Sequence, residues 1–160
     1  MKLTISIGVI VAALLTGCAS NTKSSMYQSV QRNDAVILQT NKDKMFCVKC
    51  GMKLPKFYKT NHAALHKGEM RQYCSLHCLV ADLNDGNDLK NPKVVDVTSL
   101  KFIDASQAFY VVGSKKRGTM SRVSKYAFKD QDDAKAFQKE FSGKILDLHQ
   151  AINKTQRDFR

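Results

Sequence analysis

Apolar and polar positions follow the same order twice along the chain. In the first cycle, residues 57–65 and 69–73 have the composition of two strands around a turn at 66–68. Residues 75–83 then place apolar side chains at the spacing of one helix face, and residues 93–98 are again typical of a strand. The order strand, strand, helix, strand predicts a ββαβ unit.

The second cycle repeats this order without cysteines. Residues 102–103, 108–112 and 120–128 have strand character, and residues 130–143 predict a helix that starts at an aspartate and stops at a glycine. Residues 144–148 end the cycle with a strand of the same character as 93–97. We therefore predict an α+β fold in which two small ββαβ units form a pseudo-duplicated domain.

The pattern also divides the chain into segments. Residues 1–17 start with a positive charge, continue as a short apolar run and end in small residues, as in a secretory signal. The run is shorter than the roughly 20 apolar residues that cross a bilayer. Residues 18–44, mostly polar, predict a lipid anchor and polar tether. The two units then occupy 45–100 and 101–150, and 151–160 is expected to be a polar tail.

Cys18 directly follows Leu15-Thr16-Gly17. This arrangement resembles the lipobox of bacterial lipoproteins, in which the cysteine is acylated and becomes the mature N-terminus. The resemblance implies a protein of the cell envelope, lipid-anchored and facing the periplasm. Ala19 stands where an aspartate would favour the inner membrane, so the outer membrane is the expected location. A plain secretory signal with an incidental cysteine is the alternative.

The formal net charge of +12 changes this picture little. An exported protein meets little nucleic acid, and the lysines are scattered, so we expect no nucleic-acid partner. The one basic run, Lys115-Lys116-Arg117, is typical of a solvated hairpin tip. The chain has no nucleophile–base triad, paired-carboxylate motif, phosphate-binding loop or dinucleotide fingerprint. We therefore predict that it is not an enzyme.

Four further cysteines form two close pairs: Cys47 and Cys50 in C-x2-C, and Cys74 and Cys78 in C-x3-C. An exported compartment favours disulfides, but two such short loops would constrain little of the unfolded chain. Two close pairs are the usual arrangement around one metal ion. Cys74 and Cys78 flank a predicted helix N-terminus four residues apart, which places them on one face and favours the thiolate.

Cys50-Gly51-Met52 adds a thioether two residues from a thiolate. Gly51 permits the turn that would bring both sulfurs to one ion, and such soft donors favour Cu(I). Met52 as core filler is the alternative. His77 is either a further ligand or a surface residue. A structural Zn(II) held by the four cysteines explains the thiols but leaves Met52 unexplained.

Four segments stand out along the chain: Phe46–Met52, Gln72–Cys78, Ala108–Ser114, and Ala127-Phe128 with Ala134, Phe137 and Gly143. Together they resemble the NosL family, the lipoprotein accessory factors of nitrous-oxide reductase. The resemblance covers about residues 45–150. It implies two ββαβ lobes and a Cu(I)-carrying role in assembling the copper–sulfide centre of the reductase. The implied partner is the apo-reductase or its assembly machinery, with the membrane contacted through the lipid anchor.

The resemblance also assigns ligands. It implies Cys50 and Met52 as the leading copper ligands, and Met120 as a family methionine of the second lobe, although Thr-Met replaces the usual Pro-Met here. Many family members lack equivalents of Cys74 and Cys78. This pair therefore either joins Cys47 and Cys50 in a zinc site or enlarges the copper site.

Three functions remain in competition. The first is a Cu(I)-binding lipoprotein chaperone for nitrous-oxide reductase or another exported cuproenzyme. The second is a zinc-stapled interaction module of the cell envelope. The third is a thiol oxidoreductase that uses Cys47 and Cys50, which is disfavoured because Gly51 and Pro55 oppose the helix that normally follows a redox C-x-x-C.

Overall fold

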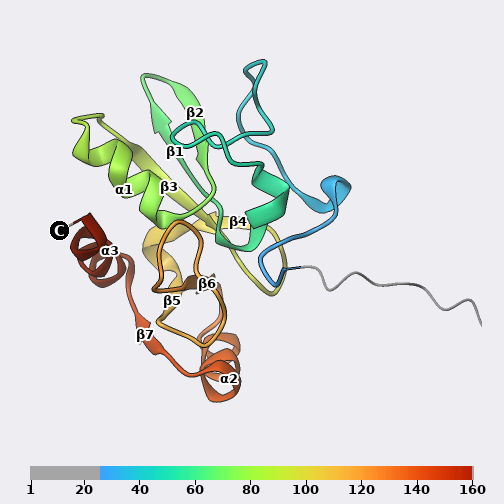
Figure 1. The fold of residues 1–160 in the computed structure, drawn as a ribbon, viewed down its shortest axis with the longest axis vertical. Coiled ribbons are helices and arrows are strands. Elements are labelled where there is room, and N and C mark those ends of the chain that lie inside the picture. The colour runs from blue at the N-terminus through green and yellow to red at the C-terminus, as the bar shows by residue number, and fades with distance from the viewer. Residues whose placement is uncertain (1–25, 160) are drawn as a thin grey trace, which may run out of the picture.

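Two antiparallel sheets organise residues 26–159, the part of the chain that the computed structural model describes (Figure 1). The predicted signal segment and the lipidation site Cys18 lie outside these residues. Between residues 26 and 159, no helix combines the length and the apolar character that a bilayer crossing needs.

The first sheet has the strand order β2-β1-β3-β4. It consists of β1 (His62–His66), β2 (Glu69–Tyr73), β3 (Lys90–Val95) and β4 (Phe102–Asp104). Lys67 and Gly68, both with positive φ, form the tight turn between β1 and β2. Helix α1 (Leu76–Asn84) begins at Ser75, whose side chain accepts a hydrogen bond from the Cys78 amide.

The second sheet has the strand order β6-β5-β7. It consists of β5 (Phe109–Val112), β6 (Lys125–Phe128) and β7 (Lys144–Leu146), with α2 (Gln131–Phe141) between β6 and β7. The order strand, strand, helix, strand thus occurs as β1-β2-α1-β3 and as β5-β6-α2-β7. The fold is α+β, as predicted. That the two units arose by duplication remains a prediction.

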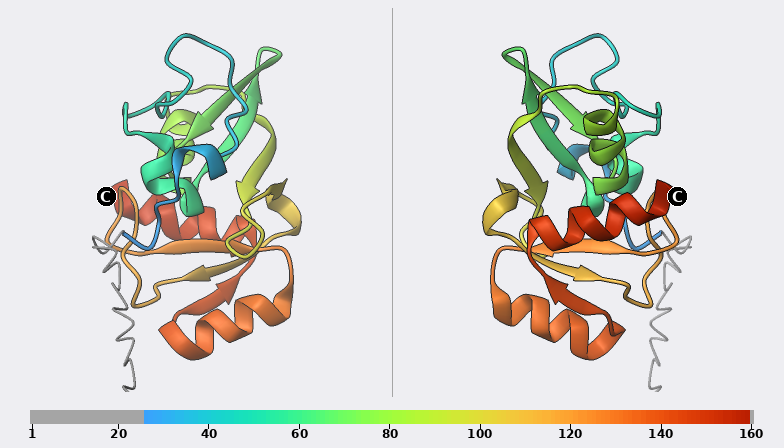
Figure 2. Two further views of the ribbon diagram at one scale, coloured as in Figure 1. Left: turned by 90° about the vertical axis from the view of Figure 1, so that its right-hand side faces the viewer. Right: turned by 90° about the vertical axis from the view of Figure 1, so that its left-hand side faces the viewer.

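Both faces of the second sheet are covered (Figure 2). Val111, Tyr126 and Phe128 pack with α2 in one core cluster. Tyr110 and Ala127 belong to the other core cluster, which is shared with the first unit. Neighbouring residues of one strand point to opposite faces, which explains this division. The second unit is therefore joined to the first unit by a continuous core.

Helix α3 (Leu148–Gln156) lies between the second sheet and the first unit (Figure 2). The prediction of a polar tail over 151–160 was therefore wrong. Asp147 and Gln150 form a capping box at its start, and Ala151 and Thr155 are fully buried. The sequence signal was weak because the buried face uses small side chains. The described residues also contain four short 3-10 helices: η1 (Arg32–Asp34), η2 (Leu54–Thr60), η3 (Ala105–Gln107) and η4 (Arg157–Phe159).

Part of the predicted tether also packs on the folded body. The Tyr27 ring lies 5.3 Å from that of Tyr126 and 5.9 Å from that of Phe137. Gln28 is buried and donates a hydrogen bond to the Arg117 carbonyl. The expectation of a free tether therefore fails for residues 26–28.

Some predicted strand limits differ from the structure. Residues 54–60 form η2, whose first turn contains Pro55, so β1 starts only at 62. Of the strand predicted over residues 120–128, only residues 125–128 form a regular strand, β6.

Candidate metal site

The first pair of thiols lies in a tight turn. The Gly51 amide donates to the Cys47 carbonyl at 2.9 Å, and the Cys47 amide donates to the Met52 carbonyl at 2.8 Å. Gly51 has φ +72°, a conformation that residues with a side chain rarely adopt. Phe46 and Lys53 close the turn as an isolated bridge. The turn expected at Gly51 is therefore present, and no helix follows Cys50 directly.

The second pair comes from the junction of β2 and α1. Cys74 follows the last residue of β2, and Cys78 lies in the first turn of α1. Asp82 of α1 holds this junction, because its Oδ2 accepts from the Tyr73 hydroxyl at 2.7 Å and from the Arg71 guanidinium at 2.8 Å. No local sequence pattern indicates this contact.

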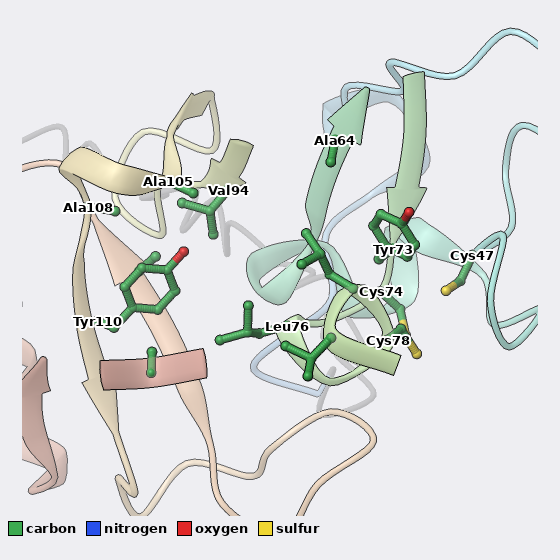
Figure 3. Close-up of a cluster of buried hydrophobic side chains, with 14 of the residues drawn as sticks. Cys47, Ala64, Tyr73, Cys74, Leu76, Cys78, Val94, Ala105, Ala108 and Tyr110 are labelled. Atoms are coloured by element: carbon green, nitrogen blue, oxygen red, sulfur yellow. The ribbon is translucent and has the colours of Figure 1, made fainter. Parts of the chain in front are cut away.

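All four thiol sulfurs lie within 4.8 Å of one another, and none forms a disulfide. The sulfur of Cys74 is 3.5 Å from that of Cys50 and 3.7 Å from that of Cys78. A tetrahedron of thiolates at a metal–sulfur distance of about 2.3 Å has edges of about 3.8 Å. The four sulfurs therefore have the spacing of the donors around a single ion, and Figure 3 shows Cys47, Cys74 and Cys78 side by side.

Burial differs among the four thiols. Cys47, Cys74 and Cys78 are at most 3% exposed and belong to the first core cluster, whereas Cys50 is half-buried. Cys50 is therefore the thiol of the four that is most easily reached from outside.

The thiols also influence one another's protonation. Hydrogen bonds from the Cys74 and Cys78 thiols lower the pKa of Cys47. The hydrogen bond to Cys47 raises the pKa of Cys74 and that of Cys78, and burial adds to both increases. One thiolate therefore forms readily while further negative charge is opposed. A bound cation would remove that opposition and release the remaining protons.

Met52 is half-buried and packs against the core cluster that contains the buried cysteines. Its position is compatible with both core packing and metal binding, so its role as a ligand remains a prediction.

His77 is not part of the four-thiol group. Its ring stacks on Phe159 of η4, with 4.3 Å between the ring centroids and an angle of 21° between the planes. This contact gives His77 a structural role in joining α1 to the C-terminal segment.

Met120 lies in the loop between β5 and β6, is 44% exposed and has φ +58°. The preceding residue, Thr119, shares a hydrogen bond of 2.9 Å with the hydroxyl of Thr60, which also donates to the Cys74 carbonyl at 2.8 Å. These bonds tie the Met120 loop to the backbone of a candidate ligand. Thr60 was missed in the sequence because Thr119 lies far away along the chain.

Comparisons with known proteins agree with this arrangement. The model of the NosL family matches residues 38–155. The crystal structure of the copper chaperone NosL from Shewanella denitrificans has a similar fold, with a TM-score of 0.55 and 23% sequence identity. The match covers 70% of this chain and 94% of that one. A search of curated proteins found no match. Because the family model spans both units and all four clustered thiols, this chain belongs to the NosL family.

Proposed function

We propose that this protein binds Cu(I) and delivers it for assembly of the copper centre of nitrous-oxide reductase or another exported cuproenzyme. The observation that carries the proposal is the cluster of four free thiols, whose sulfurs all lie within 4.8 Å of one another. An all-sulfur donor set favours a soft monovalent ion. Membership of the NosL family supports this choice, as does the similarity in fold to a copper chaperone.

Delivery requires that the ion can leave. A carrier of this kind catalyses no reaction, since it exchanges one set of sulfur ligands for another. Cys50 is the half-buried thiol of the cluster, so an incoming ligand would first meet the ion there. The three buried thiols would hold the ion until Cys50 is replaced.

The cellular setting is part of the proposal. Residues 1–17 would direct export, and acylated Cys18 would anchor the chain in the outer membrane, facing the periplasm. The partner would be the apo-enzyme or its assembly machinery. We also propose that the second ββαβ unit, a duplicate without thiols, presents Met120 as an additional copper ligand.

A second candidate is a zinc-stapled interaction module. The sulfur–sulfur distances of 3.5 and 3.7 Å support it, because they fit a tetrahedral Zn(II) site. The oxidoreductase alternative has less support, because Cys47 and Cys50 lie in a turn and not at the start of a helix.

An anaerobic Cu(I) titration in competition with dithiothreitol tests the proposal. We expect about one Cu(I) per chain, weaker binding in Cys50→Ser and Met52→Leu, and unchanged binding in the control Met70→Leu. X-ray absorption then counts the sulfur neighbours. Copper binding that is unaffected by both site substitutions would refute the proposal.

The zinc alternative makes the opposite predictions. Protein purified without added copper would contain one zinc ion per chain, chelation would unfold it, and Met52→Leu would change nothing.

Copper content of the target enzyme in cells that express Cys18→Ser tests the anchor, because an unanchored chain should deliver less copper.

A further inference from the structure

We infer that a hollow beside the thiol cluster docks an acidic, apolar segment of the protein that receives the metal. This inference rests on the proposed carrier function and adds the partner's recognition surface to it. The hollow has a volume of about 350 Å³ and is lined by Arg32, Met45, Phe46, Lys53, Pro55 and Lys56.

The lining combines three cations with three apolar side chains and contains no carboxylate. Arg32, Lys53 and Lys56 are exposed, and none of them takes part in the ion pairs found over residues 26–159. Phe46 is 37% exposed. An exposed aromatic side chain beside unpaired cations is typical of a binding surface.

The hollow adjoins the turn that carries Cys47 and Cys50. Phe46 also lines a second hollow, of about 570 Å³, together with Asn41, Asp43, Cys47, Val48 and Gly51, so the acidic part of the occupant is expected in the first hollow, whose lining has no carboxylate. Val48 is 41% exposed, so apolar surface extends along the turn that leads to Cys50. Lys53 pairs with Phe46 across the same turn. A chain seated in the first hollow would therefore lie against the turn that holds two of the thiols.

The chemistry of the lining defines the occupant. An aromatic or branched side chain would fill the space between Met45, Phe46 and Pro55, and flanking carboxylates would meet the three cations. A second copy of this chain is disfavoured by repulsion, because each copy has a net charge of +12. Charge complementarity thus favours a different, acidic protein.

Docking in the first hollow would promote transfer of the metal to the partner. The cations would accelerate encounter with an acidic partner, and the occupied hollow would hold the partner's own ligands close to Cys50. Affinity for the metal and affinity for the partner would then depend on different side chains.

The test uses the mature chain, metal-free and Cu(I)-loaded, and a capped peptide with one phenylalanine between two pairs of aspartates. Amide NMR shifts are expected to map to the residues that line the two hollows. The triple variant Arg32→Glu/Lys53→Glu/Lys56→Glu should bind the peptide about tenfold more weakly, since three exposed ion pairs are lost.

Two controls complete the experiment. The matched variant Lys101→Glu/Lys139→Glu/Lys144→Glu, with the same charge change at exposed positions elsewhere, should bind the peptide within about twofold of the wild type. A peptide with glycine in place of phenylalanine should bind at least about tenfold more weakly, because burying a phenylalanine contributes more than 1.4 kcal/mol.

The inference is overturned if the two triple variants behave alike or if the glycine peptide binds equally well. It is also overturned if anionic phosphatidylglycerol vesicles shift the lining residues while the peptide does not, or if the chain self-associates through them. The Cu(I) titration is read separately on the same variants. Loss of copper binding there would refute the carrier function, whereas intact copper binding without peptide docking would refute only this inference.

Discussion

Removal of the Asp82 carboxylate should loosen the junction that supports the second thiol pair. Asp82 is buried in α1, and its Oδ2 accepts from the hydroxyl of Tyr73, a side chain with no exposed surface. The same oxygen accepts from Arg71, whose side chain is 31% exposed. Asn87 donates to Oδ1 at 3.1 Å. Asp82→Ala removes the carboxylate that accepts from all three side chains at once.

The loss of stability depends on whether each donor can find another acceptor after the substitution. The Tyr73 hydroxyl stays buried without an acceptor, which costs about 1–3 kcal/mol. Arg71 can turn to water, so its loss costs at most about 1 kcal/mol. We therefore expect Asp82→Ala to lower the free energy of unfolding by about 2–3 kcal/mol. Tyr73→Phe should cost about 1 kcal/mol, since it leaves the carboxylate with its other donors.

Urea unfolding of the reduced, metal-free protein, followed by circular dichroism, measures these values. The double variant Asp82→Ala/Tyr73→Phe should be more stable than the sum of the single effects predicts, because it no longer buries an orphaned hydroxyl. A cost below about 0.5 kcal/mol for Asp82→Ala, or strict additivity in the double variant, contradicts the reasoning.

Three further predictions concern other parts of the fold. Burial lowers the pKa of His62 to about 4, below its unfolded value of about 6.5. The free energy of unfolding should therefore be highest above pH 6.5 and fall by up to about 3 kcal/mol as the pH approaches 4. Urea unfolding across this range should show a weaker pH dependence in His62→Gln. Ala151→Glu buries a charge against α1 and should cost at least about 3 kcal/mol in thermal unfolding, whereas the exposed control Asn153→Glu should stay within about 0.5 kcal/mol. Tyr27→Ala should cost about 1–2 kcal/mol in the same assay through loss of its aromatic contacts; no loss would indicate that residues 26–28 behave as a free tether.

Local chemistry made much of the first unit predictable. The turn between β1 and β2, the start of α1 between Cys74 and Cys78 and the apolar face of α1 are short-range features, and each lies close to where the sequence placed it. The second helix was equally accessible, because its apolar positions and Gly143 form a local pattern. These features depend on neighbours within a few residues, which the sequence displays directly.

The elements that were missed depend on distant contacts. Helix α3 has a small buried face, and Ala151 became a core residue only because α1 and the second sheet enclose it. Tyr27 looked like part of a polar tether until the rings of Tyr126 and Phe137 were placed beside it. In both cases the apolar surface that the segment covers comes from elsewhere in the chain.

By itself, the sequence determined the two pairs of thiols and their soft chemistry, since ligand type and spacing within each pair are local properties. Only the tertiary structure decided that the two pairs meet at one place, that Cys50 is the accessible member and that His77 turns to Phe159 instead. The physical reason is that burial and long-range distances arise when the turn at Cys47, the β2–α1 junction and the C-terminal segment pack together, and no local pattern records that packing.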